Sequence, residues 1–261
     1  MRSLFVFTIF ITVATLSAFH GKIAGAAELR IGVRNDIPLT GYYDFQGKRA
    51  GSEIVLAKNL AKFMGKGLSM KTVQAKERLD FLTSGKVNML IAALSKTPER
   101  EKLMAFSKPY KVDHQGMLVS NAAIKSLADL KNKRVGVVKG ATSRRRIEEK
   151  FPLMKIVAFE NYYQAMLALS IGDVDGVSAD KSILTGMVAL WNAPRKKLIV
   201  TDGDLVFWVD LKSRTESSKR SDLKILDNNL SDEVYVIGVS KEHASWLKDV
   251  NAFLDQRSLE K

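Results

Sequence analysis

The sequence predicts an α/β protein of two similar lobes, each a mainly parallel sheet flanked by helices, joined by a hinge that the chain crosses twice. Short apolar runs alternate with segments of helical periodicity, which indicates βαβ units. The pattern then restarts, because 134–137 echoes 30–33 and 169–179 echoes 82–92 in the same order. The length of 261 residues is enough for two domains of ordinary size.

The elements of the first lobe follow from their periodicity. The apolar run Leu29–Val33 predicts a buried strand, and Glu53–Met64 predicts a helix whose apolar residues form one stripe. Leu68–Val73 and Met89–Leu94 predict further strands, and Glu77–Ser84 predicts the helix between them. Strands that alternate with helices indicate parallel pairing.

The chain is expected to leave the first lobe near Val119 and to return near Leu223. We therefore predict that residues 28–119 and 223–261 form the first lobe and that 120–222 form the second. The stretch from Lys197 to Asp222 includes the apolar run 205–209. It predicts either an extra strand with a Ser- and Arg-rich loop or a surface for a partner.

The N-terminus has the pattern of a secretory signal peptide over residues 1–27. Arg2 forms a short basic region, Leu4–Leu16 is almost wholly apolar, and small residues follow at 24–27. Cleavage is expected after Ala26 or Ala27, and an uncleaved N-terminal anchor is the alternative. The net charge of +13 would otherwise suggest that the protein binds nucleic acid, but nucleic acid is not the expected partner of a periplasmic protein. Both lobes share the basic excess, which would steer a small anion toward a cleft.

The composition excludes several kinds of site. The sequence has no cysteine and three histidines, of which His20 lies in the signal peptide. A thiolate or histidine-rich metal centre is therefore excluded, and we expect neither a metal nor a cofactor. No acid–base pair stands out, so no catalytic residue is predicted.

Polar residues follow the predicted strands, where open α/β sheets bind their ligands. Thr97 and Pro98 predict a helix start, and Arg100 lies in its first turn, where a cation opposes the helix dipole. Arg100 therefore either meets an anionic ligand or pairs with Glu99, Glu101 or solvent.

Two further strand ends complete this set. Thr142 or Ser143 can cap a helix whose free N–H groups hold a carboxylate, although a plain cap is the alternative. Asp180 ends a strand, where it would accept an ammonium group or cap the next helix. An arginine, an anion-binding helix start and an aspartate together fit a zwitterion. The run Arg144–Arg146 is predicted to be a solvated face.

In the order in which they occur, these segments resemble the periplasmic amino-acid-binding proteins of ABC importers, which have the type II two-lobed fold. The segments that carry the resemblance are 29–33, 51–57, 84–88, 95–100, 106–110, 126–131, 135–143 and 172–180.

The resemblance implies roles for individual residues. Arg100 would clamp the α-carboxylate of the ligand, and Ser95 would add a hydrogen bond. Thr142 would contact the same carboxylate from the second lobe, with Ser143 beside it. Asp180 would take the α-ammonium. Ala93 stands where many members have a contacting Gly or Ser.

The resemblance also bears on the side chain of the ligand. Arg34 and Arg78 match arginines of glutamate- and aspartate-binding members, and with Arg100 they would converge on one cleft. Two spare guanidiniums suit a second carboxylate. The alternative is that Arg34 or Arg78 pairs with a carboxylate of the protein, namely Asp36, Glu53 or Asp80.

The sequence thus predicts a monomeric periplasmic binding protein that captures an amino acid, acidic ones included, and delivers it to an ABC permease. One alternative is a periplasmic dehydratase for a prephenate-like acid, with Glu53 or Asp180 as its acid. The other is a ligand- or partner-binding sensor without a role in transport.

Overall fold

The computed structural model describes residues 28–44, 46–192, 197–202, 205–210 and 223–259, with the backbone alone for 197–202 and 205–210. The predicted signal peptide and its cleavage site lie outside these residues. In the described part of the chain, no helix is both long and apolar enough to cross a membrane.

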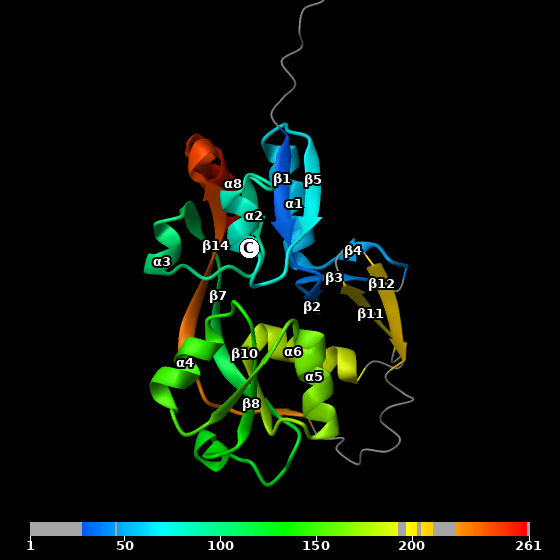
Figure 1. Cartoon of the computed structure of the whole chain (residues 1–261). Helices are drawn as coiled ribbons and strands as arrows, with labels where there is room; N and C mark the ends of the chain where they lie inside the picture. Colours follow the sequence, from blue (N-terminus) through cyan, green and yellow to red (C-terminus); the bar gives the residue numbers. More distant parts are fainter. Residues whose placement is uncertain (1–27, 45, 193–196, 203–204, 211–222, 260–261) are drawn as a thin grey trace, which may run out of the picture.

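The chain forms two lobes, which lie one above the other in Figure 1. In lobe 1 the parallel strands β5, β1 and β6 lie side by side, and β14 follows β6. The elements of lobe 1 are β1 (Leu29–Val33), β2 (Asp36–Ile37), β3 (Gly41–Tyr43), β4 (Arg49–Ala50), α1 (Ser52–Phe63), β5 (Leu68–Thr72), α2 (Arg78–Thr83), β6 (Met89–Ile91), α3 (Pro98–Glu101), η2 (Lys241–Trp246) and α8 (Leu247–Leu259).

Lobe 2 repeats this arrangement with the parallel strands β10, β8 and β9. Its elements are η1 (Leu127–Leu130), β8 (Arg134–Val138), α4 (Ser143–Lys150), β9 (Lys155–Phe159), α5 (Tyr162–Ile171), β10 (Gly176–Asp180) and α6 (Lys181–Trp191). The short strand β13 (Lys224–Ile225) pairs with the end of β7 (Met104–Val119). The strands β11 (Lys197–Asp202) and β12 (Leu205–Asp210) form an antiparallel hairpin in the long stretch noted in the sequence.

Two long strands run from one lobe into the other. These are β7 (Met104–Val119) and β14 (Ser231–Ser240), which pair antiparallel from Ser231 opposite Gln115 to Ser240 opposite Met104. The register of this pair shifts on both sides of Val236. Figure 1 shows both strands passing between the lobes. The predicted fold class, two α/β lobes joined by two crossings, is confirmed, and the lobe bounds at 119/120 and 222/223 stay a prediction.

Apolar clusters hold each lobe together and also join the two. Leu29, Ile31, Leu60 and Ile237 belong to a buried cluster in lobe 1 that packs α1 and α8 on the sheet. A second cluster packs α5 and α6 on the sheet of lobe 2 and includes Ile37, Ala75 and Ala93 of lobe 1. The lobes therefore meet through buried apolar contacts as well as through polar side chains.

The predicted helices and strands of lobe 1 agree with the structure to within one residue at most ends. The exception is the predicted strand Met89–Leu94, because β6 ends at Ile91. Ala93 has a φ of 47°, which takes the backbone into the left-handed region and ends the strand. This early end matters because the turn at Ala93 lies at the site described next.

Candidate functional site

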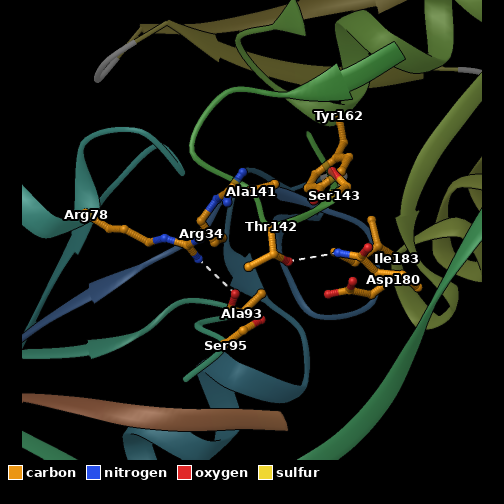
Figure 2. Close-up of a pocket in the computed structure, with 11 residues that line it drawn as sticks. Arg34, Arg78, Ala93, Ser95, Ala141, Thr142, Ser143, Tyr162, Asp180 and Ile183 are labelled. Atoms are coloured by element: carbon orange, nitrogen blue, oxygen red, sulfur yellow. Dashed lines mark hydrogen bonds between the residues drawn. The ribbon is translucent and has the colours of Figure 1, made fainter. Parts of the chain in front are cut away.

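A small pocket lies between the lobes at the ends of their strands. Its free volume is about 10 Å³, roughly the space of one water molecule. An amino acid can therefore enter only when the lobes separate. The lining side chains come from both lobes, and Figure 2 shows Arg78 on one side and Asp180 on the other. They are Arg34, Arg78, Ala93, Ser95, Gln115, Ala141, Thr142, Ser143, Tyr162, Asp180 and Ile183.

Arg100 lies just behind this lining. Thr97 caps α3 through its side chain and Pro98 begins the helix, as the sequence predicts. Arg100 is 8% exposed, and its guanidinium donates to the carbonyl of Ser95 over 2.7 Å. It also donates to the carbonyl of Gly140 in lobe 2 over 3.2 Å. The alternative in which Arg100 pairs with Glu99, Glu101 or solvent is therefore not what the structure has.

Arg78 is buried and faces backbone carbonyls. It donates to Ala92 over 2.7 Å, to Ala93 over 2.8 Å and, across the lobes, to Gly140 over 3.0 Å. The left-handed turn at Ala93 lets two successive carbonyls point at one guanidinium, and Figure 2 shows the contact with Ala93. Burial and, to a smaller extent, the charges of Arg100 and Arg34 lower the pKa of Arg78 to about 9.

For each of Arg34 and Arg78 the alternatives were a guanidinium left for a ligand or an ion pair with a carboxylate of the protein, and the two residues differ. Arg34 pairs with Asp36, through Nε over 2.8 Å and through Nη2 over 2.6 Å. Burial alone would lower the pKa of Arg34, but the charge of Asp36 raises it overall. Arg78 bonds to carbonyls, while Glu53 accepts from the backbone N–H of Ala93 and from the hydroxyl of Tyr110.

The contribution of lobe 2 comes from the start of α4. Thr142 is the N-cap residue but makes no side-chain cap bond, because its Oγ1 accepts from Nε2 of Gln115 over 2.8 Å. The hydroxyl of Ser143 is buried, and within the described residues it has no hydrogen-bond partner. Both hydroxyls line the pocket, so a carboxylate at the helix start would meet donors there.

Asp180 lies at the N-cap of α6, also without a side-chain cap bond. Its carboxyl accepts a hydrogen bond from the hydroxyl of Tyr235, on the crossing strand β14. Burial raises the pKa of Asp180 to about 7; the bond from Tyr235 opposes this rise, and the charges of Glu233 and Asp113 add to it. A bound ammonium would stabilise the ionised form of this carboxyl.

The structure thus brings together in one pocket Arg34, Arg78, Ala93, Ser95, Thr142, Ser143 and Asp180, with Arg100 directly behind Ser95. The sequence did not lead us to expect Gln115, Tyr162 or Tyr235 at this site. Gln115 had a usable signal, since it is a polar residue just before the apolar run 116–119 of a predicted crossing segment. Tyr162 and Tyr235 gave no such signal, because buried tyrosines are ordinary core residues.

Ion pairs also join the lobes at the rim of the pocket. Lys76 of lobe 1 lies 2.7 Å from Glu160 of lobe 2, and Glu99 of lobe 1 lies 3.4 Å from Arg145 of lobe 2. All four side chains are well exposed, so each pair contributes little. Among the described residues, no group of three or more His, Asp or Glu is arranged to hold a metal ion.

Comparison with known proteins decides the family. The model of the bacterial extracellular solute-binding proteins, family 3, matches residues 29–260. The chain belongs to this family. Members of this family work outside the cytoplasm, as periplasmic or extracellular binding proteins. This family 3 protein is 30% identical over 235 residues to the glutamine-binding protein of Geobacillus stearothermophilus, covering 88% of this chain and 79% of the relative.

Solved structures give the same result for the fold of this family 3 protein. An ancestral arginine-binding protein bound to arginine matches with a TM-score of 0.72 and 30% identity, over 90% of this chain and 93% of that one. The ancestral amino-acid-binding protein AncCDT-1, a precursor of cyclohexadienyl dehydratase, matches with a TM-score of 0.70 and 26% identity, over 90% of each chain. The chain therefore has the type II two-lobed fold of solute-binding proteins.

Proposed function

We propose that this protein captures an amino acid between its two lobes in the periplasm and delivers it to an ABC permease. One observation carries the proposal: buried arginines and a buried aspartate from opposite lobes face one pocket. The α-carboxylate and α-ammonium of an amino acid are complementary to this pair of charges. Relatives named as glutamine-binding and arginine-binding proteins support the same ligand class.

Each predicted site residue has a role in this proposal. Arg100 takes the α-carboxylate, exchanging its bond to Gly140 for one to the ligand. Ser95 adds a hydrogen bond from lobe 1, while Thr142 and Ser143 donate to the same carboxylate from lobe 2. Asp180 takes the α-ammonium. Ala93 lets the ligand approach the backbone, since its methyl group is small.

The prediction that the ligand has an acidic side chain is supported by fewer residues than the sequence indicated. Arg34 is already paired with Asp36, so it brings no net charge to the pocket. Within the described residues Arg78 donates to backbone carbonyls, and it is the guanidinium that a second carboxylate would meet. The binding of an acidic amino acid therefore stays a prediction, and it would depend on Arg78 more than on Arg34.

Closure of the lobes is the signal that the permease reads. Ligand contacts from both lobes favour the closed form over the open one. We further propose that the signal peptide is removed after Ala26 or Ala27, and that the protein acts as a monomer of two lobes, 28–119 with 223–261 and 120–222.

Isothermal titration against the twenty common amino acids tests the proposal. One ligand should bind at one site per chain, and at a hundredfold its Kd it should stabilise the fold by about 2.7 kcal/mol. Folded protein that binds none of the amino acids would contradict the proposal. Mass spectrometry of the protein from periplasmic extract would check the cleavage site.

An enzymatic role has weaker support, and we propose that the protein is not an enzyme. Of the two acids that a dehydratase would use, Asp180 lines the pocket, whereas Glu53 is bonded to Ala93 and Tyr110. The neighbour described as a dehydratase precursor is itself an amino-acid-binding protein by name. Turnover of prephenate or arogenate in an absorbance assay would favour the enzyme instead.

A further inference from the structure

Arg34 already holds a carboxylate that belongs to the protein. Both nitrogens on one edge of its guanidinium donate to Asp36, over 2.8 Å and 2.6 Å. This two-point geometry is the one in which an arginine binds the carboxylate of a ligand. Arg34 and Asp36 are each only 2% exposed, so solvent screens their attraction little.

The same carboxylate also reaches lobe 2. Asp36 accepts a hydrogen bond of 3.1 Å from the backbone N–H of Tyr162, the first residue of α5. The Tyr162 ring centroid lies 5.7 Å from the Arg34 guanidinium carbon. Asp36 thus pairs with a lobe 1 cation and satisfies a free N–H at a lobe 2 helix start, as a bound anion between the lobes would do.

Arg78 lies in the same pocket without such a partner. Its guanidinium donates to the carbonyls of Ala92, Ala93 and Gly140, and its buried Nε has no acceptor among the described residues. A second carboxylate on the ligand would meet Arg78, but at Arg34 it would first have to displace Asp36. Repulsion between the two carboxylates opposes that exchange.

We propose that Asp36 is a specificity-determining residue: its carboxylate occupies Arg34 and lowers the affinity of the pocket for acidic amino acids relative to their amides. This inference rests on the proposed function. Asp36 acts through Arg34, so its effect must depend on that guanidinium.

The ratio of the affinities for L-glutamate and L-glutamine tests the inference, because the two ligands have the same shape and differ in charge. Isothermal titration gives this ratio for the unmodified protein, for Asp36→Asn and for the double variant Arg34→Gln/Asp36→Asn. Asparagine keeps the size of the side chain and an acceptor for the Tyr162 N–H, but leaves the charge of Arg34 free. The ratio should rise at least tenfold toward glutamate in Asp36→Asn and should return to within threefold of the original in the double variant.

Two controls keep the test decisive. Arg34→Gln alone leaves the Asp36 carboxylate unpaired, so the ratio should fall, opposite to the effect of Asp36→Asn. If circular dichroism shows that Asp36→Asn does not fold, Asp36→Ser takes its place. The unmodified protein should itself bind glutamine at least as tightly as glutamate.

The possible results separate this inference from the function on which it rests. An unchanged ratio in folded Asp36→Asn, or a glutamate preference above tenfold in the unmodified protein, overturns the role of Asp36 and leaves amino-acid binding intact. A rise that persists in the double variant also overturns it, since Arg34 would not be involved. Absence of binding by any amino acid overturns the proposed function and this inference together.

Discussion

Arg100 of lobe 1 donates a hydrogen bond to the main-chain carbonyl of Gly140 in lobe 2 over 3.2 Å. The same guanidinium is fixed from behind by the carbonyl of Ser95. Carbonyls are neutral acceptors, so a carboxylate in their place would form a stronger, charge-assisted bond. We therefore expect a ligand anion to replace the Gly140 carbonyl as the acceptor of this Arg100 hydrogen bond.

Replacing Arg100 should weaken ligand binding strongly. Arg100→Ala removes hydrogen bonds to a charged group, worth about 3 kcal/mol, so the Kd should rise roughly a hundredfold. Arg100→Lys keeps the charge but not the planar fork, and it should recover a part of the loss. Isothermal titration measures both. Arg145→Ala, an exposed arginine at the rim, is the matched control and should change the Kd by less than threefold.

Affinity should depend on pH through Asp180, whose pKa is about 7 in the ligand-free protein. An α-ammonium needs the ionised carboxylate, so below pH 7 binding must release the proton of Asp180. The Kd should then rise about tenfold per pH unit as the pH falls. Asp180→Asn should bind more weakly at pH 8 and show a flat profile from pH 5 to 8 in titration calorimetry.

The stability of the ligand-free protein should change with pH in the direction opposite to the affinity for the ligand. Because the pKa of Asp180 is raised from 3.8 to about 7, the folded state holds a proton that the unfolded state has released between these values. The free energy of unfolding should therefore fall as the pH rises through this window. Urea unfolding at pH 4.5 and 7.5 measures the change. A slope that is the same in Asp180→Asn would contradict the assignment to this residue.

Closure of the lobes should depend on the absence of a side chain at Gly186, in the middle of α6. A Cβ at Gly186 would lie 2.5 Å from the carbonyl oxygen of Pro38 in the other lobe. Alanine favours the helix by about 1 kcal/mol over glycine, so Gly186→Ala should keep or raise the Tm of the ligand-free protein. The clash with Pro38 costs about 1–3 kcal/mol in the closed form, so the Kd should rise between fivefold and a hundredfold.

The neighbouring Thr185 provides the control for Gly186. Its side chain is exposed on the same helix, so Thr185→Ala should leave the Kd unchanged. An equal effect of the two substitutions on the Kd would indicate damage to α6 rather than obstructed closure.

Gln115 should contribute to binding through Thr142. Its Nε2 holds the Thr142 hydroxyl, and its buried Oε1 has no partner within the described residues. Gln115→Met keeps the length of the side chain but frees Thr142, and the loss of about 1.5 kcal/mol should raise the Kd roughly tenfold. His114→Gln, on the exposed face of the same strand, is the control. Equal affinities for the unmodified protein and Gln115→Met would show that Thr142 needs no support.

The fold could be predicted from the sequence because its signals are local. The apolar run of β1, the stripe of α1 and the Thr97–Pro98 helix start depend on residues a few positions apart. The strand ends then predicted where the polar side chains gather. Arg144–Arg146 also formed the expected solvated face, with ion pairs to Glu148 and Glu149.

The partners within the site could not be predicted in the same way. Asp36, which Arg34 binds, also accepts from the backbone N–H of Tyr162, which lies 126 residues further along the chain. The sequence also does not predict the turn at Ala93, because alanine rarely adopts a positive φ. Such choices are made by tertiary contacts, which periodicity does not encode.

The pairing of β7 with β14 through both lobes should restrict how the lobes move. A flexible tether would let them swing freely, whereas a hydrogen-bonded ribbon can only twist or bend. We expect it to bend most easily beside Val236, where the register shifts. Such a ribbon would limit the two lobes to a narrow range of relative orientations, so an open and a closed form should each have a reproducible outer surface.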